Sequence, residues 1–145
     1  MEKLNRRTAR ENAFMAAFAA TFDGAMPEEV IEIHNEQGEN VVDVFGQTLL
    51  RNYYEHSAEV NDMIKAHLRN WTIDRLPRVS VTVLRLALSE MLYSDEKMPS
   101  VVINEAVELT KKFGGEGDYQ FVNGLLGSVV RELGLADSAP TVEQA

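Results

Sequence analysis

The stretch from Val79 to Tyr93 constrains the fold of this chain more than any other part of its sequence. If it is helical, apolar side chains point in nearly every direction, and Thr82, Arg85 and Ser89 form a single narrow polar line. A helix that is apolar nearly all round belongs in the middle of a core, covered by other elements. The β-branched run 79–83 also permits a strand, but the length of the segment and the Leu-Ala-Leu that follows favour a helix.

Helical spacing also dominates the rest of the chain, and no alternating strand pattern persists. Phenylalanines recur every fourth residue at 14, 18 and 22 and predict a helix over 6–22, with either Asn5 or Thr8 as its N-cap. Further helices are expected over about 27–35, from about 41, from an N-cap at Ser57, over 99–113, and over 118–133 from an N-cap at Asp118. Gly124 and Gly127 would weaken the last helix unless another backbone approaches them closely.

These helices predict an all-α fold, a compact bundle of about seven helices. We expect one helical domain over residues 1–134, followed by a disordered C-terminal tail over 135–145. The central helix 79–93 is expected to carry two structural polar links, through Arg85 and Glu90. If either charge is buried, a partner must lie nearby, because an unpaired buried charge costs several kcal/mol.

The composition excludes several classes of function. The chain has no cysteine, which rules out disulfides, zinc–thiolate sites and a thiol nucleophile. No segment approaches the roughly 18 uninterrupted apolar residues of a membrane span, so we expect a cytoplasmic protein that does not bind membranes. The three histidines lack the spacing of known metal motifs, and no glycine-rich phosphate loop is present. We therefore predict no metal site.

Charge is distributed unevenly along the chain. The net charge of −9 argues against a general binder of polyanions. Arginines nevertheless gather at the start of the first helix, at Arg6, Arg7 and Arg10, whereas acidic residues gather over 28–39. Guanidinium groups on adjacent helical turns can contact phosphates and stack on unpaired bases. From spacing alone, however, a solvated helix start is the plainer interpretation.

Two stretches of sequence resemble the NusB family. The first is Arg-Thr-Ala-Arg-Glu-Asn-Ala over 7–13. The second combines 83–90, Pro99, the Ile-Asn-Glu-Ala-Val-Glu-Leu of 103–109, Lys111, Phe113-Gly114 and the Phe-Val-Asn-Gly-Leu-Leu of 121–126. Their order and spacing resemble the family over about 6–133, strongly from Val79 onward and weakly between 24 and 71.

The resemblance implies a fold of two subbundles, without catalysis or a cofactor. It implies a transcription antitermination factor that binds boxA RNA together with NusE, a ribosomal protein of the small subunit, within the RNA polymerase antitermination complex. It also turns the arginine cluster into an RNA site, with Arg6, Arg7 and Arg10 as contacts. A second RNA-contacting region is implied at Lys111, Lys112, Tyr119 and Gln120.

Several positions depart from the family pattern or have a structural interpretation. Gly117 and Gln120 stand where the family often carries an acid and a basic residue, which should weaken the second region. The NusE-facing surface is expected at Phe18, Phe22 and Ser80, where Phe18 replaces a common tyrosine and Ser80 a common acid.

Three polar residues, Asn104, Glu105 and Asn123, are expected to cap helices or form buried hydrogen bonds rather than to act in catalysis. Phe121 is expected in the core.

Two other functions remain open on the sequence. The chain is alternatively a helical protein-interaction adaptor, perhaps a homodimer, that binds no RNA. NusB-like domains also precede ribosomal RNA methyltransferases, but such an enzyme needs a further cofactor-binding domain, which these 145 residues do not contain.

Overall fold

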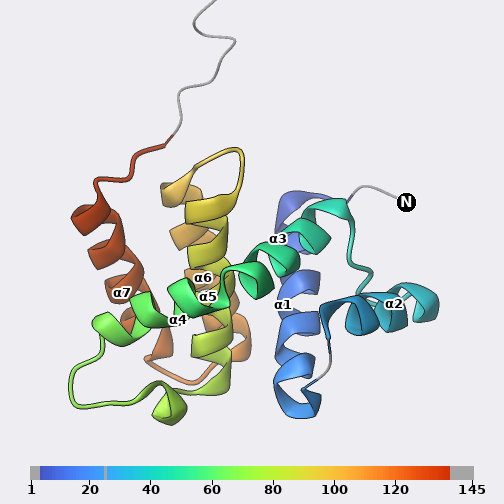
Figure 1. Ribbon diagram of the computed structural model, residues 1–145, viewed down its shortest axis with the longest axis horizontal. Coiled ribbons are helices and arrows are strands. Elements are labelled where there is room, and N and C mark those ends of the chain that lie inside the picture. The colour runs from blue at the N-terminus through green and yellow to red at the C-terminus, as the bar shows by residue number, and fades with distance from the viewer. Residues whose placement is uncertain (1–3, 25, 138–145) are drawn as a thin grey trace, which may run out of the picture.

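The computed structural model describes residues 4–24 and 26–137 of the chain. Within these residues it consists of helices, with no strand (Figure 1). The elements are α1 (Arg6–Asp23), α2 (Pro27–Gln37), α3 (Val44–Glu55), α4 (Ser57–Ala66), the short 3-10 helix η1 (Ile73–Arg75), α5 (Arg78–Tyr93), α6 (Pro99–Phe113) and α7 (Asp118–Leu133). The predicted all-α fold of about seven helices is confirmed.

The helices form two groups that share α5. Helices α1, α2 and α3 pack on one another on one side of the molecule, while α4, α6 and α7 pack with α5 on the other side (Figure 1). Helices α6 and α7 form an antiparallel hairpin with the most extensive mutual packing in the fold. Since α1 and α3 also contact α5, this helix joins the two subbundles.

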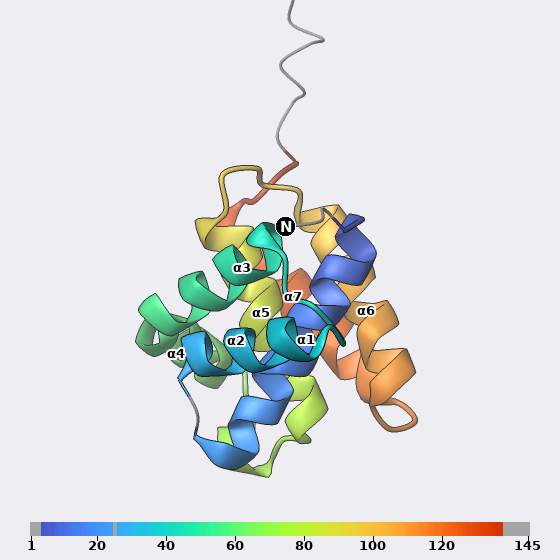
Figure 2. The ribbon, with the colours of Figure 1, turned by 90° about the vertical axis from the view of Figure 1, so that its right-hand side faces the viewer.

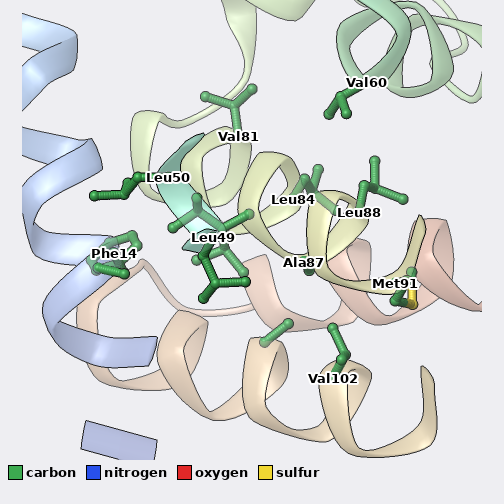
Figure 3. Close-up of a cluster of buried hydrophobic side chains, with 14 of the residues drawn as sticks. Phe14, Leu49, Leu50, Val60, Val81, Leu84, Ala87, Leu88, Met91 and Val102 are labelled. Carbon is green, nitrogen blue, oxygen red and sulfur yellow. The ribbon is translucent and has the colours of Figure 1, made fainter. Parts of the chain in front are cut away.

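Helix α5 lies in the middle of the core, as its apolar pattern predicts. Eleven of its 16 residues are buried. Figure 3 shows Leu84, Leu88 and Met91 projecting from it among side chains of the neighbouring helices. The hydroxyls of Thr82 and Ser89 are buried as well, and each donates a hydrogen bond of 2.7 Å to the carbonyl oxygen four residues earlier. Both hydroxyls are therefore satisfied by the backbone of their own helix, without water.

Side-chain caps decide where two helices begin. Asn5 caps α1, because its side-chain oxygen accepts the N–H of Thr8 at 2.8 Å, so Thr8 is not the cap. Helix α3 begins at Val44 rather than near 41, because the carboxylate of Asp43 accepts the N–H of Gly46 at 2.8 Å. The residue before this cap is held in place by the side chain of Asn35, which bonds both backbone groups of Val42.

The two other predicted N-caps are wrong by one residue. Ser57 and Asp118 are the first helical residues of α4 and α7, and the residues before them occupy the cap positions. Asp118 instead stabilises the turn between α6 and α7, since its carboxylate accepts the N–H of Gly115 at 2.8 Å. The positive φ of 85° at Gly117 in the same turn suits glycine.

The chain beyond α7 returns to the start of α6. The carboxylate of Asp137 accepts hydrogen bonds from the backbone N–H and the hydroxyl of Ser100, and these bonds hold the pKa of Asp137 below its usual value. The tail predicted from residue 135 onward is thus attached to the bundle at Asp137. Residues 138–145 lie outside the described residues.

Glycines 124 and 127 are not explained by close approach of another backbone. A Cβ atom at Gly124 would meet nothing within 4 Å, and one at Gly127 would meet only the side chain of Arg131, at 3.3 Å. By contrast, a Cβ atom at Gly114 would lie 2.7 Å from the carbonyl oxygen of Thr110. The close approach of another backbone, which would have explained a glycine at position 124, is therefore not found in the described structure.

Gly124→Ala should stabilise the protein by about 1 kcal/mol, because alanine removes the entropic cost of glycine inside a helix without a clash. Gly114→Ala is the matched control and should be destabilising, because the new Cβ would collide with backbone. Urea unfolding followed by circular dichroism measures both changes. A Gly124→Ala variant that is less stable than wild type contradicts the open environment described for this position.

Candidate nucleic-acid interface

The three arginines at the start of α1 have different environments. Arg6 is exposed, and its guanidinium lies over the ring of Phe45 in α3, 4.0 Å from the ring centroid. It forms no ion pair with any described residue. A guanidinium stacked in this way keeps its second face and its N–H groups available to a ligand.

Arg7 connects α1 to α6 at the surface. Its Nε lies 3.0 Å from Oε2 of Glu105, and a second nitrogen donates to Oε1 at 3.1 Å. The hydrogen bond with Glu105 is the main reason why the pKa of Arg7 is raised. The Arg7 side chain remains 65% exposed, so water competes for this pair and the guanidinium can also reach a ligand. Glu105 thus links two helices, but through an exposed pair rather than the cap or buried hydrogen bond that the sequence predicted.

Arg10, which was also predicted to contact RNA, is largely buried, unlike Arg6 and Arg7. Its side chain is 13% exposed and forms two hydrogen bonds, of 2.9 and 2.7 Å, with the carboxylate of Glu90 in α5. Arg6 and Arg10 lie on the same face of α1, since both lie near the ring of Phe45, but Arg10 lies next to α5 and pairs with it. The predicted structural link of Glu90 is confirmed, and that of Arg85 as well, since its Nε donates to Asn61 at 2.9 Å.

The two predicted RNA-contacting regions meet across α1 and α6, which lie side by side in Figure 2. Lys112 pairs with Glu11 of α1 at 2.7 Å, close to the Arg7–Glu105 pair. A pocket of about 360 Å³ lies between them. Its charged lining comprises Arg7, Lys111, Lys112, Glu11, Glu105 and Glu108, three cations and three carboxylates. The surface is therefore rich in charge but locally balanced.

Beyond this pocket, the surface continues onto α7, and we call the residues Arg7, Lys111, Lys112, Tyr119 and Gln120 together the surface strip. The ammonium of Lys111 lies 4.8 Å from the centroid of the Tyr119 ring, and Gln120 is exposed beside it. Phe121 is 38% exposed rather than part of the core, because it lies at the edge of the buried stripe that Val122 and Leu125 define on α7. The position of Phe121, one residue before Val122 and therefore about 100° away from it around the helix, is the signal in the sequence for this exposure.

Asn104 and Asn123 do not have the structural roles predicted for them. Both side chains are exposed on the helix surface, and neither makes a hydrogen bond within the described part of the chain. They line one pocket together with Tyr119 and Gln120. These two amides therefore lie beside Tyr119 and Gln120, two of the predicted RNA contacts.

The surface expected to face a partner protein lies at the other end of α1. The rings of Phe14, Phe18 and Phe22 follow one another at centroid distances of 5.7 and 5.2 Å, and Phe22 is 59% exposed. The guanidinium of Arg78, from the first turn of α5, lies 4.3 Å from the centroid of the Phe22 ring. The end of α1 and the start of α5 therefore form one surface.

Ser80 does not belong to that surface. It is 1% exposed, and its hydroxyl has no hydrogen-bond partner. The prediction that Ser80 faces the partner fails because α5 is covered on nearly every side, so a polar residue near its start can still point inward.

Two classes of site are absent from the described residues. No group of three or more histidine, aspartate or glutamate side chains is placed to hold a metal ion. No helix there is long and apolar enough to cross a membrane. The fold and surface define an all-helical binding module whose exposed cations, amides and aromatic rings lie along α1, α6 and α7.

The comparisons with known proteins agree with this class. The sequence model of the NusB family matches residues 7–131. The transcription antitermination protein NusB of Bacillus velezensis is 40% identical over 130 residues, covering 90% of this chain and 98% of that protein. The corresponding protein of Bacillus subtilis is 37% identical with the same coverage. The chain belongs to the NusB family, and this membership confirms that it is an antitermination protein rather than an enzyme.

Solved structures support the same assignment. NusB of T. maritima superposes with a TM-score of 0.80 at 30% identity, covering 90% of this chain and 94% of that one. A chain from a complex of the antitermination factors NusB and NusE with double-stranded RNA superposes with a TM-score of 0.77 at 30% identity, covering 88% and 96%. The predicted family and fold are thereby confirmed.

The Arg10–Glu90 pair leads to a test of the role of Arg10. Arg10→Met should lower the free energy of unfolding by about 3–5 kcal/mol, because it leaves the buried carboxylate of Glu90 without a partner. Adding Glu90→Leu should restore most of that loss. Arg7→Met is the surface control and should have little effect. Urea unfolding measures all variants, and equal small losses for Arg7→Met and Arg10→Met contradict a structural role of Arg10.

Proposed function

We propose that this protein binds boxA RNA jointly with the ribosomal protein NusE and acts within the RNA polymerase antitermination complex in the cytoplasm. The observation that carries the proposal is the meeting of Arg7 of α1 with Lys111 and Lys112 of α6 around one pocket. Arg6, the residue before Arg7, adds an exposed guanidinium that stacks on Phe45 of α3. The names of the relatives and of the NusB–NusE–RNA complex support it. Transcription takes place in the cytoplasm of bacteria, and the relatives are bacterial.

The exposed cations have distinct roles in this proposal. Arg6 stacks on Phe45 and presents its outer face to an unpaired base or its N–H groups to a phosphate. Arg7, Lys111 and Lys112 contact phosphates along α6. Tyr119 offers a ring for stacking and Gln120 an amide for a base edge. Arg10 does not contact RNA in this proposal. Its pair with Glu90 holds the start of α1 against α5 and so positions Arg6 and Arg7.

The small number of exposed cations limits how strongly salt affects RNA binding, and the three carboxylates in the pocket weaken the effect further. Each phosphate contact on single-stranded nucleic acid contributes about 0.7 to the slope of log affinity against log salt concentration. Four exposed cations therefore contribute a slope no steeper than about −3. Arg7 is paired with Glu105, and Lys112 is paired with Glu11. Each of these ion pairs is weakened when its cation binds a phosphate, which reduces the net gain from that contact.

Arg6→Ala should weaken boxA binding by about five- to a hundredfold and flatten the salt slope by about 0.7, because it removes both a stacking face and a phosphate contact. Fluorescence anisotropy at two salt concentrations, with and without NusE, measures both quantities. Arg69→Ala, which removes an exposed arginine after α4, is the matched control and should change neither. Wild-type affinity in a combined Arg6→Ala, Arg7→Ala variant would falsify this RNA site.

We also propose that NusE binds at the surface formed by Phe18, Phe22 and Arg78. An exposed aromatic ring beneath a guanidinium has the composition of an interface anchor, since aromatic residues and arginine are enriched in binding hot spots. The start of α5 contributes through Arg78, and Ser80 is excluded from direct contact by its burial.

Phe22→Ala should weaken NusE binding by about tenfold or more while leaving the free energy of unfolding almost unchanged, because the ring is already largely in water. Ser80→Ala is the control and should leave NusE affinity unchanged. It should also raise stability by about 1 kcal/mol, because it removes a buried hydroxyl without a partner. Calorimetric titration and urea unfolding provide the two readouts. Loss of NusE binding in Ser80→Ala alone would reverse this assignment.

A further inference from the structure

We propose that a pocket between α6 and α7 receives one unpaired nucleobase of the bound RNA, an inference that rests on the proposed function above. The pocket has a volume of about 390 Å³ and opens to the surface of the α6–α7 hairpin. Its lining includes Ile103, Asn104 and Val107 from α6 and Tyr119, Gln120 and Asn123 from α7. Amide, aromatic and aliphatic groups thus meet in one recess.

The amide groups of this pocket are unengaged. Asn104, Gln120 and Asn123 are exposed, and none makes a hydrogen bond within the described part of the protein. Other amides are used structurally, such as Asn12, which donates to a carbonyl at 2.9 Å, and Asn35, which bonds both backbone groups of one residue. The pocket therefore brings together three amides whose donors and acceptors remain available to a ligand.

The chemistry of the pocket matches a neutral, flat, hydrogen-bonding ligand. Each amide offers two N–H donors and one carbonyl acceptor, the complement of a base edge. The side chains of Ile103 and Val107 and the ring of Tyr119 supply apolar surface against which a base face can pack. No lysine or arginine lines the pocket, so a phosphate group alone would find no countercharge there. These features select the base of a nucleotide rather than its phosphate.

The surroundings orient the nucleotide. Lys111 lies at the turn end, over the Tyr119 ring, seven residues and therefore about 10 Å along α6 from Asn104. At the opposite end, Ser100 holds the carboxylate of Asp137, which repels a phosphate. The phosphates should therefore lie toward Lys111. That direction leads to the pocket lined by Arg7 and Lys112, so one RNA strand can follow both sites.

The test combines a protein change with a change in the RNA. The full-length Asn104→Ala, Asn123→Ala variant is titrated with boxA RNA and with a set of the same RNA carrying one abasic nucleotide at each position in turn. Alanine is favoured over asparagine in helices, so the variant keeps the fold. For wild type, one abasic position should weaken binding by about tenfold. The double variant should bind intact RNA about tenfold more weakly and should be insensitive to that same abasic position.

Gln37→Ala is the matched control, because it removes an exposed amide at the end of α2 and should leave every affinity unchanged. Wild-type affinity of the double variant, or an undiminished abasic effect in it, overturns the base pocket while leaving RNA binding at Arg6 intact. Loss of NusE binding alone in the double variant also overturns it, since the pocket then serves a protein. Absence of RNA binding by the wild-type protein overturns this inference together with the proposed function.

Discussion

The burial of α5 on nearly all sides is the constraint from which the rest of the structure follows. Eleven buried residues of this helix require cover from several directions, and no single neighbouring helix can supply it. Helices α1 and α3 cover it from one side, and α4, α6 and α7 from the other. This arrangement brings the start of α1 beside α6, although their paired side chains are about a hundred positions apart in the chain. The surface strip thus exists because the helices that cover α5 bring α1 and α6 together.

One polar link fixes that arrangement at its most sensitive point. The Arg10–Glu90 pair joins the first turns of α1 to the last turns of α5 through two hydrogen bonds in a nearly buried setting. A buried pair gives little net stability compared with apolar packing, but any shift of α1 that separates the two charges is strongly unfavourable. The pair therefore sets the register of α1, and with it the positions of Arg6 and Arg7.

How far the sequence predicts this protein depends on the kind of question. Helix number, the central place of α5 and most helix ends follow from apolar periodicity and glycine positions, which are local properties. The direction in which a polar residue points does not follow from them. Arg10 and Ser80 turn inward because α5 and its neighbours cover them, and Phe121 turns outward at the edge of a buried stripe. Asn104 and Asn123 show the same limit, since only the paired geometry of α6 and α7 reveals that the fold leaves their amides unused.

The charge of the protein bears on why RNA and a protein partner would be bound together. With a net charge of −9 and a surface on which three cations face three carboxylates, long-range attraction of RNA is weak. In the proposed function, affinity comes from short-range contacts instead: bases stack on Arg6 and Tyr119, and amides form hydrogen bonds with base edges. A partner that binds at Phe22 and also contacts the same RNA raises the effective concentration of each component for the other. In the proposed function, joint binding therefore compensates for the weak long-range attraction between this acidic helical bundle and a nucleic acid.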